Sequence, residues 1–267
     1  MIAKNSDTND LLWKNISSLP YFRAYLRAVE GRFYEDIDLV NPVLDVGIGD
    51  GHFSATTLPG QIEAGIDPSY RSLREAKSFS AANSLVCANG DSLPFAGEYF
   101  NTVISNSVLE HILDVDSVLK EINRLLKPGG LFVICVPNDN FTQNLSLARL
   151  STTIGLKNFT IWYQRLFNKI SRHFHPDKTE VWKKRLEQAG FEVMRFWNYF
   201  SPRSLAILEW GHLFGIPAWV NKQLFGKWIL IPRKWFHWPL YQWLNQHYQR
   251  NQKAENGAYT FFIMTKR

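Results

Sequence analysis

The sequence predicts an α/β fold in which helices cover both faces of a doubly wound, mostly parallel β-sheet. The first observation behind this prediction is the segment 43–51, where a short apolar run ends in glycines at every second position. The second is the alternation of strand-like apolar runs with amphipathic, helix-like runs from residue 43 to residue 136. Parallel strands need a crossover between them, so this alternation favours a parallel sheet with helices packed on it.

The glycines at 47, 49 and 51 predict a tight turn between the first strand and the next helix. Such a turn bends the backbone sharply and leaves no Cβ between the main chain and a ligand, although glycine-rich turns also serve as plain connections. The second strand is expected to end at Asp67, 20 residues after Gly47. An acid there can accept hydrogen bonds from both hydroxyls of a ribose, or it can cap the following helix. Turn and acid together indicate a nucleotide-like ligand.

Periodicity and composition predict the other elements in chain order. Strands are expected at residues 43–46, 63–67, 85–88, 100–105, 131–136, 191–197 and 258–264. Helices are expected at residues 19–32, 68–84, 117–126 and 181–190. Lys127-Pro128-Gly129-Gly130 should end the third of these helices, because proline and glycine do not continue a helix. Asp177 and Glu180 have the spacing of a capping box for the fourth.

The composition is that of a folded intracellular protein. The chain has 267 residues, 45% of them hydrophobic, which is enough to bury a full core in one elaborated domain. Its two cysteines, Cys87 and Cys135, lie in strand-like runs and indicate neither a disulfide framework nor a cysteine metal site. Residues 1–10 lack the pattern of a signal peptide, and no apolar run is long enough to span a membrane. We therefore expect a cytoplasmic location.

The net charge of +6 is distributed unevenly along the chain. Residues 1–135 contain 11 Lys and Arg against 17 Asp and Glu, a net −6, whereas residues 136–267 contain 19 against 7, a net +12. A basic second half suits an anionic partner such as a membrane surface, a phosphorylated carrier or nucleic acid. A solvated basic face without a partner is the alternative.

Five motifs occur in order between residues 43 and 137: Leu44-Asp45-Val46-Gly47-x-Gly49-x-Gly51, Gly65-Ile66-Asp67, Asp91-Ser92-Leu93-Pro94-Phe95, Ser105-Asn106-Ser107-Val108-Leu109-Glu110-His111-Ile112 and Leu126-Lys127-Pro128-Gly129-Gly130. Their residues and spacing resemble the class I S-adenosylmethionine-dependent methyltransferases, in particular the branch labelled methyltransferase type 11. The resemblance covers about half of the chain. It implies a Rossmann-like sheet of seven strands, the last of them antiparallel, and methyl transfer from S-adenosylmethionine.

The resemblance also implies roles for the cofactor-binding residues. The expected contacts are Asp45 with the ammonium group, the backbone amides of Gly47, Gly49 and Gly51 with the carboxylate, Asp67 with the ribose hydroxyls, Asp91 and Ser92 with the adenine edge, and Asn106 with the methionine portion. The N-terminus of the helix after the glycine turn would assist in binding the carboxylate. For Asp91, a turn role before Pro94 is the alternative.

Histidines are the candidates for the chemistry and for the acceptor site. His111 follows the fourth strand, nearest the expected methyl group, where it would act as a base or only brace a loop. His173 and His175 lie two residues apart and have the spacing of metal ligands, but the sequence shows no third ligand, so we expect them to line the substrate site and expect no metal.

Two insertions separate this chain from the pattern it resembles. We expect a methyltransferase domain at residues 1–200 plus 256–267, interrupted by a small helical insertion at 141–170 and a larger one at 201–255. Residues 201–250 contain six of the ten tryptophans and six Lys and Arg, but Glu209 is their single acid. This composition suits a cap over the acceptor pocket, a cap that also touches a membrane surface, or a surface for unpaired bases.

The leading functional prediction is a methyltransferase for a small or lipid-linked acceptor, such as a polyprenyl-linked sugar or a quinone. One alternative is an RNA methyltransferase, which the basic charge favours, although no RNA-binding module is recognisable. The other is a nicotinamide-dependent oxidoreductase, because the glycine turn and Asp67 also suit a nicotinamide cofactor. Nucleic acid is not the expected partner. The sequence does not identify the acceptor or the oligomeric state.

Overall fold

The computed structural model describes residues 10–267, apart from the side chains of Leu213 and Ile216, and its chain forms two compact units. Unit 1 contains the described part of Met1–Ile37 together with Arg203–Gln252, and unit 2 contains Asp38–Pro202 and Lys253–Arg267. The large insertion thus forms one unit with the N-terminal helices, which the sequence analysis had grouped with the sheet.

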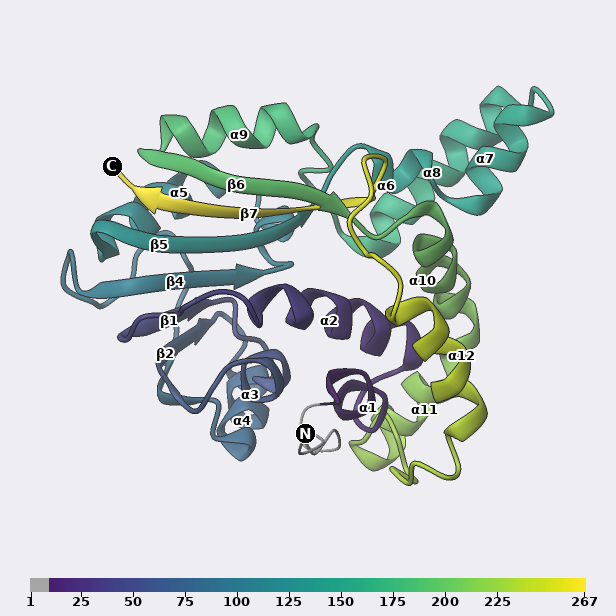
Figure 1. Ribbon diagram of the computed structural model, residues 1–267, viewed down its shortest axis with the longest axis horizontal. Coiled ribbons are helices and arrows are strands. Elements are labelled where there is room, and N and C mark those ends of the chain that lie inside the picture. The colour runs from purple at the N-terminus through teal and green to yellow at the C-terminus, as the bar shows by residue number, and fades with distance from the viewer. Residues whose placement is uncertain (1–9) are drawn as a thin grey trace, which may run out of the picture. The chain divides into compact units, whose positions relative to one another are not determined.

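Unit 2 is built on a seven-stranded sheet with the strand order β3-β2-β1-β4-β5-β7-β6 (Figure 1). The strands are β1 Val43–Val46, β2 Ile62–Asp67, β3 Ala82–Cys87, β4 Phe100–Asn106, β5 Leu126–Pro137, β6 Phe191–Tyr199 and β7 Tyr259–Lys266. Strands β1 to β5 pair in parallel, and β7 runs antiparallel to both β5 and β6. The predicted α/β fold with a mostly parallel, seven-stranded sheet is confirmed.

The helical elements of unit 2 connect these strands. They are α3 His52–Thr57, α4 Tyr70–Phe79, the 3-10 helix η1 Leu109–His111, α5 Val115–Leu125, α6 Asn140–Gln143, α7 Ser146–Thr153, α8 Lys157–Ser171 and α9 Thr179–Gln188. The apolar stripe of α5 is buried at Val118, Leu119 and Ile122, in one cluster with Trp182 of α9 and Phe132 of β5. Helical spacing brings these α5 residues to a single face, and their burial fixes α5 against the sheet.

Two local predictions need correction. Helix α5 ends at Leu125, directly before Lys127-Pro128-Gly129-Gly130 as predicted, but strand β5 begins at Leu126 and not at residue 131. The segment therefore lies within β5, and the pairing of β4 with β5 shifts register between Phe100 and Thr102. Asp177 does not cap α9, whose N-cap is Lys178 and has no side-chain cap. Instead, an Asp177 carboxylate oxygen accepts a hydrogen bond of 3.0 Å from Arg185.

Unit 1 is a small helical body. It contains α1 Leu11–Ile16, α2 Tyr21–Tyr34, α11 Ile216–Phe225 and α12 Trp238–Tyr248, together with nearly all of α10 Pro202–Phe214. The α2 residue Tyr25 is fully buried, and its hydroxyl lies 3.1 Å from Ser204 Oγ and 3.4 Å from Gln252 Oε1. A Cβ on Gly211 would overlap Phe22, so a small residue is needed for α2 and α10 to approach this closely.

None of the helices among the described residues is both long enough and apolar enough to cross a membrane.

Candidate active site

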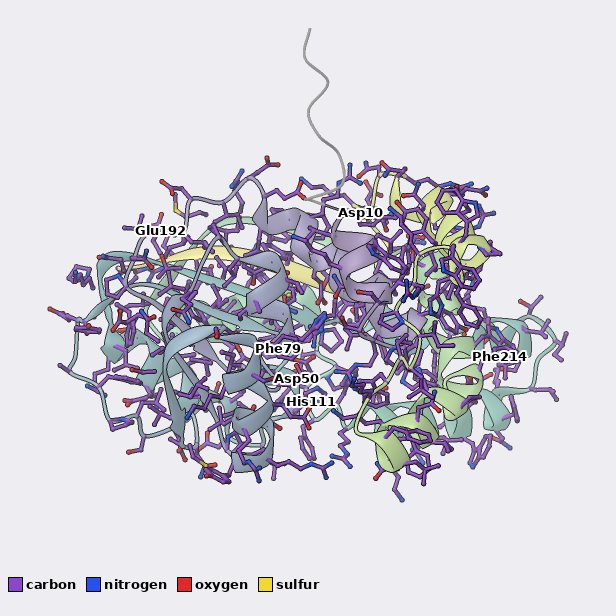
Figure 2. The ribbon with its side chains drawn as sticks, turned by 90° about the horizontal axis from the view of Figure 1, so that it is seen from below. Asp10, Asp50, Phe79, His111, Glu192 and Phe214 are labelled. Carbon is purple, nitrogen blue, oxygen red and sulfur yellow. The ribbon has the colours of Figure 1, made fainter. Side chains whose placement is uncertain are left out.

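The candidate site lies where the strand order of the sheet reverses. From β1 the chain proceeds to β2 and β3 on one side, then crosses to β4 and β5 on the other. The loop after β1, residues 47–51, and the residues after β4 therefore meet beyond the carboxyl ends of neighbouring strands, the position where open α/β sheets bind ligands. Figure 2 shows Asp50 of this loop and His111 of η1, both at this end of unit 2.

The three glycines of the loop are required for different reasons. All have positive φ, at 84° for Gly47, 57° for Gly49 and 75° for Gly51, which a side chain disfavours. A Cβ on Gly47 would overlap the side chain of Val108, and one on Gly51 would lie 2.9 Å from Ala76. A Cβ on Gly49 would meet no protein atom within 4 Å. Gly47 and Gly51 thus permit packing of the loop, whereas Gly49 faces open space.

Asp67 joins this loop to the end of β2. One carboxylate oxygen accepts a hydrogen bond from the Gly49 amide at 3.1 Å, and the other accepts one from the Ser69 amide at 2.8 Å. The side chain is half-buried. Asp67 is not the cap of α4, because the N-cap of that helix is Ser69, whose own side chain accepts the capping hydrogen bond. Asp67 instead holds the Ser69 amide and lies against the glycine loop.

The other residues expected to bind a cofactor differ in accessibility. Asp45 is 3% exposed and accepts a hydrogen bond from Ser54 Oγ of α3. Asn106, at the end of β4, is 6% exposed and accepts a hydrogen bond from the thiol of Cys135. Asp91 and Ser92 follow β3 in a turn and are exposed. Asp45 and Asn106 are thus held by protein partners, while Asp91 and Ser92 face outward.

His111 is oriented by a backbone carbonyl. Its Nδ1 lies 3.0 Å from the carbonyl oxygen of Arg172, and a carbonyl cannot donate, so Nδ1 carries a hydrogen and, in the neutral ring, Nε2 carries the lone pair. Nε2 lies 3.8 Å from Glu110 Oε1. The His111 side chain is 40% exposed, whereas that of Glu110 is 1% exposed. A partly exposed imidazole thus faces a buried carboxylate, and that anion stabilises the ring when Nε2 takes up a proton.

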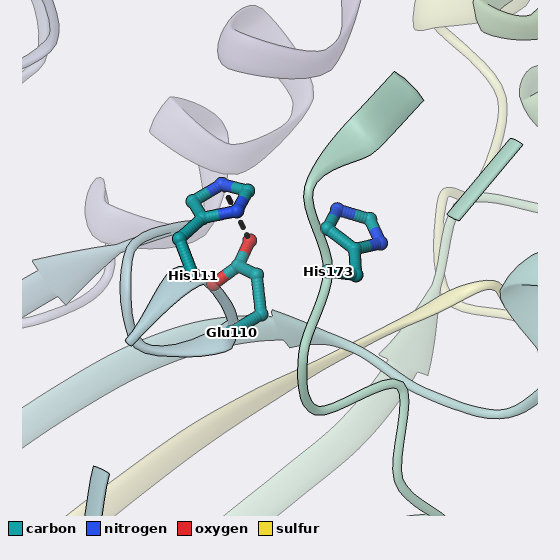
Figure 3. Close-up of side chains that lie close together, drawn as sticks. All are labelled: Glu110, His111 and His173. Carbon is teal, nitrogen blue, oxygen red and sulfur yellow. Dashed lines mark ion pairs between the residues drawn. The ribbon is translucent and has the colours of Figure 1, made fainter. Parts of the chain in front are cut away.

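His173 lies across from this pair, as Figure 3 shows. The His111 and His173 rings have centroids 5.4 Å apart, and the amide of Phe174 donates to the carbonyl oxygen of Glu110 at 2.8 Å. The sequence suggested no third ligand beside the His173 and His175 pair, but the fold brings Glu110 and His111 to His173.

These three side chains have the composition of a metal site. Their potential ligand atoms all lie within 4.8 Å of one another. Ligands of a tetrahedral ion lie about 3.4 Å apart, given metal–nitrogen distances of about 2.1 Å. A divalent ion would therefore require the group to contract.

His175 lies apart from this group. Its Nε2 is 2.9 Å from the carbonyl oxygen of Ile112 and 3.2 Å from that of Leu113, and its Nδ1 is 3.5 Å from Asp177 Oδ2. Both ring nitrogens thus contact protein groups. His175 connects the loop after η1 to the start of α9, while His173 is the histidine of the pair that lies beside His111.

Sequence reasoning did not single out Glu110 or the Arg172 carbonyl. Glu110 was visible as the neighbour of His111 in the fourth motif, and a carboxylate adjacent to a candidate base is a signal that can be read from sequence. The Arg172 carbonyl carries no such signal, because any residue type supplies a carbonyl. Its position follows from the end of α8, where Arg172 has a φ of 57°.

Comparison with known proteins agrees with the fold and with the glycine loop. The family described as "Methyltransferase domain" matches residues 44–134, which include the loop, Asp67 and the Glu110–His111 pair. About a third of the chain, residues 44–134, thus matches a methyltransferase domain. A SAM-dependent methyltransferase from Thermotoga maritima shares its fold with a TM-score of 0.55 at 16% identity, over 92% of this chain and 91% of the other.

Two further proteins resemble this chain. A ubiquinone biosynthesis O-methyltransferase from Rhizobium leguminosarum is 27% identical over 61% of this chain and 64% of its own length, so the match spans less than two thirds of that relative. Phosphoethanolamine N-methyltransferase 2 from Haemonchus contortus, solved with phosphomonomethylethanolamine and S-adenosylhomocysteine, has a TM-score of 0.55 at 18% identity, over 93% of this chain and 54% of the other.

The different roles of the glycines give a testable expectation. Gly47→Ala should lower the free energy of unfolding by about 1–3 kcal/mol more than Gly49→Ala, because the added methyl group overlaps Val108 in the first variant only. Both variants share the strain of a positive φ, so Gly49→Ala is the matched control. Urea denaturation measures the difference, and adding Val108→Ala to Gly47→Ala should recover part of it. Equal destabilisation by the two glycine substitutions would contradict the packing role of Gly47.

Proposed function

We propose that this chain transfers the methyl group of S-adenosylmethionine to a hydroxyl group of an amphiphilic acceptor, such as a quinone precursor or a polyprenyl-linked sugar. The observation that carries the proposal is the pairing, at one end of the sheet, of an open glycine loop bonded to Asp67 with a histidine whose Nε2 can accept a proton. The first part suits binding of the cofactor and the second suits deprotonation of the acceptor.

The residues present fit the cofactor. Gly49 leaves its side of the loop open to a ligand, and the start of α3 directs backbone amides toward the same region, which suits a carboxylate. Asp67 lies at the end of β2 with both oxygens engaged by amide hydrogens, and each oxygen retains further capacity to accept hydrogen bonds from a ribose. Exposed Asp91 and Ser92 follow β3, where the adenine edge is expected.

The protein has little covalent chemistry to perform. A sulfonium cofactor supplies an activated methyl group, so the chain must position the acceptor in line and remove its hydroxyl proton. In our proposal, His111 Nε2 accepts this proton as the acceptor oxygen forms its bond to the methyl carbon. The buried Glu110 carboxylate stabilises the resulting imidazolium, and the Arg172 carbonyl holds the ring in the required tautomer. The carbon–sulfur bond breaks and a neutral thioether remains.

The acceptor class rests on the relatives and on unit 1. Among the relatives, the Rhizobium protein bears a name that describes O-methylation in ubiquinone biosynthesis, a pathway to an amphiphile. In unit 1, Trp219, Trp235 and Trp238 are exposed, and the surrounding chain is basic. By contrast, the ring of Trp228 packs against the charged groups of Arg23 and Lys222. Exposed indole rings among basic residues suit an amphiphilic acceptor or a peripheral contact with a membrane.

Asp67 is the residue that tests cofactor binding. Asp67→Ala should weaken the affinity for S-adenosylmethionine by about 10-fold to 100-fold, equivalent to about 1.5–3 kcal/mol, because ribose hydrogen bonds to a charged group are lost. Isothermal titration calorimetry measures the change. Asp116→Ala is the control, since Asp116 is also an acid but pairs with Arg185 outside the site. Equal affinities of the folded Asp67→Ala variant and wild type would remove Asp67 from the site.

His111 is the residue that tests the chemistry. His111→Gln should lower kcat for methyl transfer by about 100-fold or more, because no base then takes the hydroxyl proton. Affinity for S-adenosylhomocysteine should be unchanged.

His173→Gln is the matched control, because it leaves His111 and its carbonyl partner in place, and its effect on kcat should be smaller. Candidate quinone precursors and polyprenyl-linked sugars are the acceptors for the assay. A loss of transfer in chelator that divalent cations restore would contradict the base role and would favour a metal held by Glu110, His111 and His173.

A further inference from the structure

The helical hairpin formed by α7 and α8 has an unusual distribution of side chains. Within residues 150–162 of the hairpin, six large apolar residues are exposed, with exposed fractions of 41–61%: Leu150, Ile154, Leu156, Phe159, Ile161 and Trp162. Ser151 of α7 and Thr160 of α8 are buried, and their hydroxyl oxygens lie 2.7 Å apart. The hairpin thus buries a pair of hydroxyl groups while it exposes several large apolar side chains, which water disfavours.

Backbone and aromatic contacts hold the two ends of the hairpin. The turn between the helices passes through Gly155, with a φ of 80°, and the amide of Leu156 donates to the carbonyl oxygen of Ser151 at 2.8 Å. At the other end, Phe141 and Phe167 pack with ring centroids 5.8 Å apart and attach α8 to the body of unit 2. Figure 1 shows α7 and α8 extending together away from the sheet.

The charge of the hairpin identifies the surface that it fits. Ser146–Ser171 contains the basic residues Arg149, Lys157, Arg165 and Lys169 and no Asp or Glu. All four cations are exposed. Exposed apolar side chains flanked by cations, with no acid among them, match a bilayer of anionic lipids, whose headgroups attract the cations while its acyl region accepts the apolar groups. No described helix is suited to cross a membrane, so such a contact is superficial.

We propose that the α7–α8 hairpin of unit 2 docks on the surface of an anionic lipid bilayer, with Ile154, Leu156 and Trp162 inserted among the lipids. This inference goes beyond the proposed function and does not depend on it, because lipid binding is measured without cofactor or acceptor. The hairpin is also connected to the candidate active site. Helix α8 runs directly into Arg172, whose carbonyl orients His111, so a docked hairpin holds the site residues close to lipid-borne acceptors.

The test is flotation of the full chain with vesicles of phosphatidylcholine, with and without phosphatidylglycerol. Wild type should float with the anionic vesicles, should bind more weakly as salt is raised, and should not float with pure phosphatidylcholine. Ile154→Ser combined with Trp162→Ser should lower the affinity for anionic vesicles at least 10-fold. Arg149→Gln combined with Lys157→Gln should remove much of the dependence on salt.

The matched control is Val40→Ser combined with Met194→Ser. These residues are in the same unit and are 52% and 57% exposed, against 61% and 56% for Ile154 and Trp162, so both variants replace exposed apolar side chains without disturbing a core. The control should bind like wild type. Trp235→Ala, in unit 1, separates the hairpin from the tryptophan-rich insertion and should leave most of the hairpin-dependent binding in place.

Three results would overturn the proposal. The first is that wild type ignores anionic vesicles at low salt. The second is that the hairpin variant binds as wild type does while Trp235→Ala abolishes binding, which assigns the lipid surface to unit 1. The third is that wild type is a dimer by light scattering, that the hairpin variant is a monomer and that neither binds vesicles, which makes the hairpin a subunit interface.

Discussion

The close packing of the glycine loop against the end of β4 is the constraint on which the rest of the site depends. Gly47 has no room for a Cβ because Val108 lies against it, and Val108 directly precedes the 3-10 helix that carries Glu110 and His111. The same loop is bonded to β2 through the hydrogen bond from the Gly49 amide to Asp67. One backbone turn thus fixes the relative positions of a candidate cofactor loop, a candidate ribose ligand and a candidate base.

The second half of the site is held mostly by backbone groups. His111 is oriented by the Arg172 carbonyl, and the Phe174 amide donates to the Glu110 carbonyl. The segment that supplies these groups follows the α7–α8 hairpin, so the insertion at 141–170 contributes to the site through its C-terminal end. A side chain that must hold one tautomer is best fixed by a carbonyl, because a carbonyl only accepts hydrogen bonds.

The sequence predicted those parts of the structure that have a local signal. The parallel strands were evident because each is a short apolar run followed by turn residues. The loop was evident because its glycines follow such a run and Asp67 comes 20 residues after Gly47. The register shift around Pro128 was missed, since a proline and two glycines after a helix favour a plain break. The capping box failed because Asp177 has a stronger partner in Arg185, which lies eight residues away.

Contacts between segments that are distant in the chain could not be predicted from the sequence. It identified His111, His173 and His175 as candidates but did not indicate which of them lie together, because that depends on how α8 returns to the end of β4. It identified the tryptophan-rich insertion but not its packing with α1 and α2, where Tyr25 meets Ser204 and Gln252. The exposed apolar residues of α7 and α8 have ordinary helical spacing, and only the structure shows that they face outward.

The central claim is that the loop at 47–51 and Asp67 form the binding site for the adenosyl cofactor. Hydrogen exchange of the backbone amides, followed by mass spectrometry with and without S-adenosylhomocysteine, tests it most directly. The account predicts slower exchange in the peptides that contain Gly47–Gly51 and Asp67 when S-adenosylhomocysteine is bound, and no change with NAD. Protection by NAD alone, or protection by S-adenosylhomocysteine confined to other parts of the chain, would contradict it.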